Sequence, residues 1–264
     1  GNRILENVLD KEVTEILEEN LRAHGIELYF NSMVTSIDTL DGKTKVITNT
    51  DEVEVDLVVL AAGVRPNTSF LKDTGIEMLD NGAIVIDNQG RTSIEDIYAA
   101  GDCATVYHLV KQQQVYIPLA TNANKLGRIV GSNLGGKSET FQGTLGSSCI
   151  KLLDMEAAST GITEADAKKM NLNYKATFIT DKNHTDYCPG QEKISIKLIY
   201  DADTKVILGG QAVGKSDAVQ RTNVLATAIF TKMTTEQLGM LDLCYAPPFA
   251  RTWDALNIAG NVSK

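Results

Sequence analysis

The pair Gly101-Asp102 is the part of this sequence whose residue types and spacing best suit chemistry. Residues 97–100 predict a short strand before it, which would put the carboxylate at the carboxyl edge of a sheet, where α/β folds bind cofactors. A carboxylate in that place accepts hydrogen bonds from sugar or ribityl hydroxyls, and a glycine lets a ligand approach the backbone. Taken alone, the pair is equally compatible with an ordinary turn aspartate that caps a helix.

The cysteines offer a second possible source of chemistry. The four of them lie far apart and form no Cys-x-x-Cys pair, so we expect neither a zinc site nor any other metal site. We expect Cys103, Cys149 and Cys244 to be buried small hydrophobic residues, whereas Cys188 is the one to test for reactivity. Free thiols in a chain without a signal-peptide pattern favour a reducing, cytoplasmic location.

Composition and charge exclude several classes of protein. The chain has 264 residues, 43% of them hydrophobic, which is ample for a folded core. Its 34 acidic and 25 basic residues give a formal charge of -9, so we expect no nucleic-acid partner. No apolar stretch nears the roughly 20 residues that cross a bilayer, and we expect no membrane partner.

The elements that must position these residues fall into two parts of the chain, which differ in their predicted secondary structure. In the first, an amphipathic helix at 11–24 precedes strand-like runs at 27–30, 33–38, 45–48 and 53–60. Residues 57–63 are apolar on both faces, which predicts a central parallel strand. Further strands at 82–87 and 97–102 lead to a helix that Pro118 opens.

The second part begins near Phe141, and its pattern of strands and helices predicts an α+β domain. Alternating hydrophobicity indicates antiparallel strands at 146–153, 177–180, 194–200 and 206–213. Helices are expected at 163–170, capped by Thr163, and at 220–232.

Three segments carry a resemblance to a known family. Residues 92–104, TSIEDIYAAGDCA, closely resemble the second flavin-contact motif of the pyridine nucleotide-disulfide oxidoreductases, which use FAD and NAD(P)H. Residues 56–67 look like the strand and glycine crossover between that family's NAD and FAD domains. Residues 115–128 are similar to the helix whose N-terminal amides face the flavin.

The resemblance implies an α/β fold with partial NAD- and FAD-binding Rossmann-like domains, followed by an α+β dimerisation domain with an antiparallel sheet. The implied boundaries are 1–64 for the C-terminal part of the NAD(P)-binding domain, 65–140 for the returning part of the FAD-binding domain, and 141–264 for the dimerisation domain. The implied cofactors are FAD and NAD(P)H, and the implied assembly is a homodimer. The cofactor-binding residues carried over are Gly63, Gly101, Asp102, Pro118, Leu119 and Ala120.

Residues 184–190, HTDYCPG, and residues 243–249, LCYAPPF, resemble two segments of the coenzyme A-disulfide reductase branch. In that branch the first segment reads H-x-x-Y-Y-P-G and the second contains Y-A-P-P. They imply catalytic roles for Tyr187 and Tyr245 near the partner subunit's redox site, where a phenol donates a hydrogen bond to a departing thiolate. Without the resemblance, both tyrosines are better interpreted as packing residues. Asn124 and Arg251 are the implied substrate-binding residues. Cys188 and Trp253 depart from the branch pattern, which puts coenzyme A specificity in doubt.

The family's G-x-G-x-x-G loops occur nowhere in the sequence. We therefore expect a truncated enzyme, inactive alone, whose redox cysteine lies in a missing N-terminal part. Three functions stay open: reduction of a small-molecule disulfide such as coenzyme A disulfide, an NADH oxidase or peroxidase that uses oxygen or peroxide, and a dimerisation module without activity. The sequence does not decide between NADH and NADPH.

Overall fold

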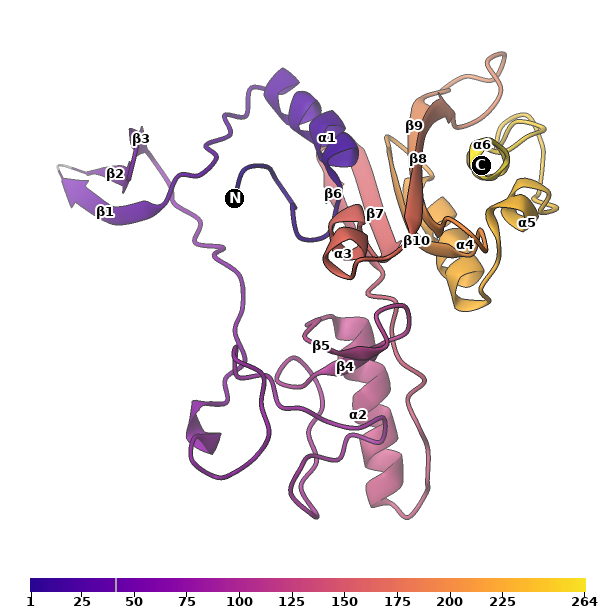
Figure 1. Cartoon of the computed structure of the whole chain (residues 1–264). Helices are drawn as coiled ribbons and strands as arrows, with labels where there is room; N and C mark the ends of the chain where they lie inside the picture. Colours follow the sequence, from indigo (N-terminus) through magenta and orange to yellow (C-terminus); the bar gives the residue numbers. More distant parts are fainter. Residues whose placement is uncertain (41) are drawn as a thin grey trace. The chain divides into compact units, whose positions relative to one another are not determined.

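The computed structural model describes residues 1–40 and 42–264, and the chain divides into two compact units. Unit 1 is Gly1–Val64 and unit 2 is Arg65–Lys264. Figure 1 shows the elements of each unit along the chain.

Unit 1 contains one helix and one small sheet. Helix α1, Lys11–Ala23, confirms the predicted amphipathic helix, because its buried apolar residues Val13, Leu17 and Leu21 share one face. Strands β1, β2 and β3 form an antiparallel sheet in that order. Their bounds are Val34–Leu40, Lys43–Thr48 and Glu52–Val55.

Two strands predicted in unit 1 are wrong for this chain. Residues 27–30 form none, and residues 57–63 follow β3 as an irregular segment instead of a central parallel strand. Leu57, Val59 and Leu60 are 79%, 78% and 83% exposed. The apolar pattern of a central strand becomes a strand only when neighbouring strands supply hydrogen bonds, and within the described part of this unit the three-stranded sheet does not extend to it.

The first part of unit 2 is built on turns and a long helix. A short 3-10 helix, η1 (Ser69–Leu71), precedes the hairpin of β4 (Val106–His108) and β5 (Gln113–Val115). Helix α2, Ala120–Leu134, begins where Pro118 predicts it. The strands predicted at 82–87 and 97–102 are wrong, since only isolated bridges form there, such as Ile84 with Ala104.

The second part of unit 2 is an antiparallel sheet of five strands in the order β6-β7-β10-β9-β8. The strands β6, β8, β9 and β10 confirm the predicted ones, whereas β7 was not predicted, because Met155–Gly161 is rich in small residues. The bounds of β6, β8, β9 and β10 are Ser148–Leu152, Tyr174–Lys182, Lys193–Asp201 and Ile207–Gly214.

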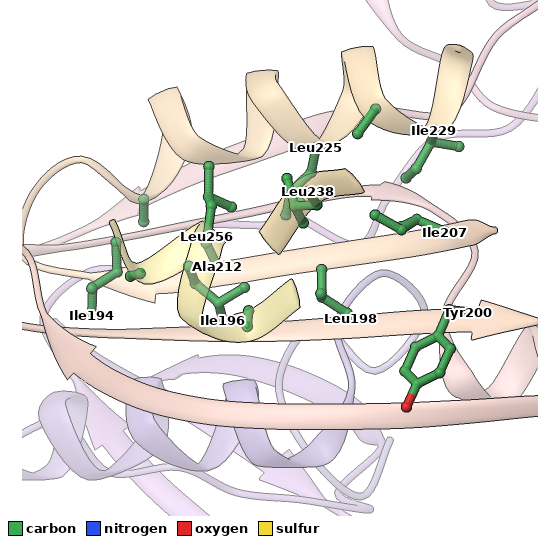
Figure 2. Packing of buried hydrophobic residues seen from close by; sticks show 14 of the residues in the cluster. Ile194, Ile196, Leu198, Tyr200, Ile207, Ala212, Leu225, Ile229, Leu238 and Leu256 are labelled. Atoms are coloured by element: carbon green, nitrogen blue, oxygen red, sulfur yellow. The ribbon is translucent and has the colours of Figure 1, made fainter. Parts of the chain in front are cut away.

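Helices cover both faces of this sheet. Ile194, Ile196 and Leu198 of β9 alternate along the strand and point into a core covered by α4, α5 and α6 (Figure 2). On the other face of β9, Ile199 packs against Ala167 of α3. The helices α3, α4, α5 and α6 span Glu164–Lys169, Ala218–Phe230, Thr235–Gly239 and Ala255–Val262.

Local capping explains where the short helices begin. Thr163 caps α3 as predicted, in a capping box with Asp166. The helices α5 and α6 were not predicted, although Thr234 with Gln237 and Asp254 with Asn257 form capping boxes at their starts. These two pairs were the available signal for both helices.

His108 joins the β4–β5 hairpin to the five-stranded sheet. Its Nδ1 accepts hydrogen bonds from the backbone N–H groups of Val110 and Lys111, both at 3.2 Å. The neutral ring therefore carries its proton on the other nitrogen, Nε2, and the backbone of Gly161, at the end of β7, lies near the ring. Burial and the neighbouring Lys111 charge lower the pKa of His108 from 6.5 to about 4.

Because the pKa of His108 is lowered, the free energy of unfolding is expected to fall at acidic pH. Between pH 6.5 and about 4 the unfolded chain binds a proton at His108 that the folded chain does not, so stability is present above pH 6.5 and is lost as pH falls toward 4. One such group changes the free energy of unfolding by up to about 1.4 kcal/mol per pH unit. Urea unfolding of the 264-residue chain at pH 7.5, 6.0 and 5.0 measures the loss.

A His108→Gln variant is the matched control, because glutamine can accept and donate hydrogen bonds but does not titrate. Its free energy of unfolding is expected to change less than that of the parent over the same pH range. Equal slopes for the two proteins would contradict the prediction.

Candidate functional site

Gly101 and Asp102 lie in a turn with room beside it. Gly101 has φ +91°, and a Cβ built there would meet nothing within 4 Å. The Asp102 side chain is exposed. Strand β4 follows, and the next α-helix begins only at Ala120, so Asp102 does not cap a helix. The pair thus presents an exposed carboxylate beside an accessible piece of backbone.

The start of α2 is suited to a negatively charged group. Its N-cap residue Leu119 makes no side-chain capping bond, and the first turn contains no acidic residue. The first amides of the helix and the positive end of its dipole are therefore available to a ligand. Leu119 and Ala120 line a cavity of about 700 Å³, which also contacts α4 and the segment 141–149. Ligand pockets are commonly of this size.

One hydrophobic cluster positions both segments of unit 2 that the family resemblance predicts to contact the cofactor. Ala100 and Cys103, on either side of Gly101-Asp102, pack against it, and so do Val115 and Ile117 just before α2. Burial raises the pKa of Tyr116, and the Asp102 charge adds to this effect, which places the two side chains near each other. Gly63 has φ +86° with open space beside it, but it lies in unit 1.

Tyr187 and Tyr245 lie on two irregular segments that the fold brings together. Tyr187 follows β8, and Tyr245 lies between α5 and α6. The neighbouring Tyr187 raises the pKa of Tyr245 above its ordinary value of 10.0, and slight burial and the neighbouring Cys188 add to the shift. Tyr187 is 71% exposed and Tyr245 is 46% exposed. The two tyrosine side chains, called the tyrosine pair below, therefore lie near each other at the surface of the protein.

Hydrogen bonds join the two ends of the segment that carries Tyr187, which runs from Asn183 to Glu192 between β8 and β9. The backbone N–H of Asn183 donates to Glu192 O at 2.9 Å, and the Asn183 side-chain oxygen accepts from Glu192 N at 2.8 Å. Asn183 also donates to Ser216 Oγ at 2.9 Å. His184 is buried, and its Nδ1 contacts the Thr185 carbonyl oxygen at 3.0 Å.

Arg221 connects the segment of Tyr187 to that of Tyr245, because it bonds both Asn183 and Asp254. Its side chain is 8% exposed and makes a two-pronged contact with the Asp254 carboxylate, with Nη2 donating at 2.6 Å and Nε at 3.0 Å. Nη2 also donates to the carbonyl oxygen of Asn183 at 2.9 Å. Sequence analysis assigned no role to Arg221, because its partners lie far from it along the chain.

The two predicted substrate-binding residues lie on different elements. Arg251 is beside the tyrosine segments, where its Nη1 contacts Asp181 Oδ1 at 2.5 Å. Lys182 and, more weakly, Arg251 lower the pKa of Asp186. Asn124 is exposed on α2. Across residues 1–40 and 42–264 the two share no hydrogen bond or ion pair, and their roles stay predictions.

The expected burial of the cysteines is wrong in two cases. Cys149 and Cys244 are exposed, whereas Cys103 and Cys188 are half-buried. Cys149 belongs to β6 at the edge of the sheet and lines the 700 Å³ cavity, and Cys244 lies in the irregular segment before Tyr245. Among the described residues, no three His, Cys, Asp or Glu side chains gather as a metal site requires. No helix in the described part is long and apolar enough to span a bilayer.

Family models match both parts of the chain. Residues 1–127 match the pyridine nucleotide-disulphide oxidoreductase model, and residues 147–256 match the dimerisation domain of the same family. The chain belongs to the pyridine nucleotide-disulphide oxidoreductase family, whose enzymes use FAD and NAD(P)H. This confirms the resemblance and the fold class, including the dimerisation domain with an antiparallel sheet.

Individual relatives span the chain but are longer than it. An NAD(P)H sulfur oxidoreductase (CoA-dependent) of Pyrococcus abyssi is 39% identical over 100% of this chain and 59% of its own length. An NADH oxidase of Enterococcus faecalis is 40% identical over 97% of this chain and 58% of its own length. The structure of an NAD-dependent persulfide reductase from A. fulgidus matches with a TM-score of 0.93 and 34% identity, over 100% of this chain and 49% of that one.

Proposed function

We propose that this chain is part of an FAD-dependent enzyme that uses NAD(P)H to reduce a small-molecule disulfide, such as coenzyme A disulfide. The overall reaction consumes NAD(P)H and one proton, breaks the S–S bond and yields two thiols. The observation that carries the proposal is the placement of the exposed side chains of Tyr187 and Tyr245 on two segments that Thr185 and Pro247 join. The CoA-dependent sulfur oxidoreductase among the relatives supports the same substrate class.

The chain's own residues suit the cofactor. The exposed Asp102 carboxylate would accept hydrogen bonds from ribityl or ribose hydroxyls, and Gly101 would admit the backbone approach that such contacts need. The uncapped start of α2, with Pro118, Leu119 and Ala120, would stabilise negative charge on the flavin ring. Gly63 would lie at the crossover between the two nucleotide-binding domains. A bound FAD would supply the redox chemistry that connects oxidation of NAD(P)H with reduction of the disulfide, and these residues would hold and orient it.

The tyrosine pair would act on the sulfur chemistry. A phenol with a raised pKa stays neutral at pH 7 and keeps its proton for hydrogen bonding. Tyr187 is exposed enough to donate to a thiolate that leaves the disulfide, which lowers the energy of the developing negative charge. The nucleophilic cysteine of this proposal lies outside the chain. We also propose that the protein acts as a homodimer, in which the tyrosines face the partner subunit's redox site.

Tyrosine-to-phenylalanine variants test the role of the hydroxyls in the full-length enzyme. Tyr187→Phe is expected to lower kcat for coenzyme A disulfide by about 10²-fold, the usual cost of removing one donor to a developing anion. Tyr245→Phe, which removes the partner hydroxyl, is expected to act in the same direction. Stopped-flow reduction of the flavin by NADH is the control and stays unchanged. Full disulfide turnover in the double variant would refute the assignment.

A second candidate is an NADH oxidase that uses oxygen or peroxide. Two observations favour it: Arg251 is already paired with Asp181, which leaves less positive charge for a coenzyme A phosphate, and an NADH oxidase is among the relatives. Comparing NADH consumption by the full-length enzyme with coenzyme A disulfide and with oxygen alone separates the two. A third reading, a dimerisation module without activity, requires that neither acceptor supports turnover.

A further inference from the structure

Exposure leaves the tyrosine pair with little packing to hold it. Tyr187 is 71% exposed, and both tyrosines lie on segments without helix or strand structure. Side chains in such a position normally sample several rotamers. A lasting contact between their hydroxyls therefore needs a link between the two backbone segments close to the rings.

Thr185 supplies such a link. Its Oγ1 donates to the carbonyl oxygen of Pro247 at 2.7 Å, and its backbone N–H donates to the same oxygen at 3.3 Å. Thr185 lies two residues before Tyr187, and Pro247 lies two residues after Tyr245. The link therefore joins the two segments at points only two residues from each tyrosine.

A second link, farther from the rings, is independent of Thr185. Arg221 holds Asn183 and Asp254, which lie at the outer ends of the two segments. Because Arg221 and Asn183 fix these ends by themselves, loss of the Thr185 contact would loosen the rings without releasing the segments from the domain.

We propose that Thr185 is a positioning residue, whose two hydrogen bonds to the Pro247 carbonyl hold the segment of Tyr187 beside the segment of Tyr245 and so keep the two side chains near each other. The proposal rests on the role given above to the tyrosine pair. Thr185 occupies a variable position of the H-x-x-Y-Y-P-G pattern, so the motif itself assigns it no task.

NMR of the 264-residue chain labelled with [13Cζ]tyrosine tests the proposal. Tyr187→Phe and Tyr245→Phe variants assign the two resonances. In the parent, Tyr245 is expected to titrate above 10.0, since the neighbouring Tyr187 favours the protonated phenol. Thr185→Val keeps the shape of the side chain but removes the Oγ1 donor, and it is expected to move the Tyr245 titration back toward 10.0. Thr185→Ser restores the donor and is expected to titrate like the parent.

Two results would overturn the proposal. One is a Tyr245 titration that is the same in Thr185→Val and in the parent. The other is a shift from Thr185→Val that persists in full when Tyr187 is already phenylalanine, because that effect would not pass through the pair. Cys188 is kept in every variant, so its influence on Tyr245 is common to all. Circular dichroism and thermal unfolding check that the variants fold.

The test does not depend on catalysis. If the NMR result fails, Thr185 does not position the pair, whatever the enzyme reduces. If Thr185→Val disrupts the pair but the full-length Tyr187→Phe and Tyr245→Phe enzymes turn over disulfide normally, the positioning holds and the proposed function fails.

Discussion

Replacing Glu164 by glutamine is expected to destabilise unit 2 by about 3–5 kcal/mol, the usual cost of removing one partner of a buried ion pair. Glu164 Oε2 lies 2.8 Å from Nζ of Lys197, whose side chain is only 1% exposed. Burial opposes the charged carboxylate, but hydrogen bonds from Lys197, Lys168 and Tyr174 outweigh it and lower the pKa of Glu164 to about 2. The free energy of urea unfolding of the 264-residue chain measures the effect.

The matched control removes the other partner. Lys197→Met is expected to cost less, because Glu164 is 24% exposed and keeps its contacts with Lys168 and Tyr174. The double variant, Glu164→Gln with Lys197→Met, is expected to recover part of the loss, since it leaves no buried lysine charge. A Glu164→Gln protein as stable as the Lys197→Met protein would show that the ammonium does not depend on this carboxylate.

Replacing Arg221 by methionine is the second large effect that we expect. It leaves the Asp254 carboxylate, which is 9% exposed, without its guanidinium, and it removes the donor to Asn183 O. Loss of one partner from such a pair costs about 3–5 kcal/mol. Chemical unfolding measures this loss of stability. Limited proteolysis reports whether the segment between residues 183 and 192, which carries Tyr187, becomes accessible to a protease.

A second substitution separates the charge from the shape. Asp254→Asn keeps a good N-cap for α6, because an asparagine oxygen can also accept the hydrogen bond from the Leu256 amide. The double variant, Arg221→Met with Asp254→Asn, is therefore expected to be more stable than Arg221→Met alone. If it is less stable, the uncompensated carboxylate is not the source of the loss.

The sequence predicted best those elements that contain their own signals. Helix α1 shows a complete amphipathic period, and α3 has Thr163 as its cap. Strand β9 was predictable because Ile194, Ile196 and Leu198 alternate along it and point into the core that α4, α5 and α6 cover. Strand β7 was missed because alanine, serine and glycine show little alternation in size or polarity.

The candidate site was only partly predictable for a different reason. The Gly101-Asp102 pair and the start of α2 are local, and both could be found from neighbouring residues. The roles of Tyr187 and Tyr245 came from the family resemblance alone, because a contact between distant irregular segments leaves no periodic pattern. The Arg221–Asp254 and Thr185–Pro247 contacts were invisible for the same reason, since each joins residues that are far apart in the sequence.

The exposed segment after β3 has a practical consequence for anyone who produces this chain alone. Residues 57–62, LVVLAA, combine strand-forming side chains with an absence of charge and proline, and Leu57, Val59 and Leu60 face solvent. Such segments pair with copies of themselves and start aggregation. Preparations of the isolated chain will therefore favour fibrous or amorphous self-association at this place, and charged gatekeeper residues there would counter it.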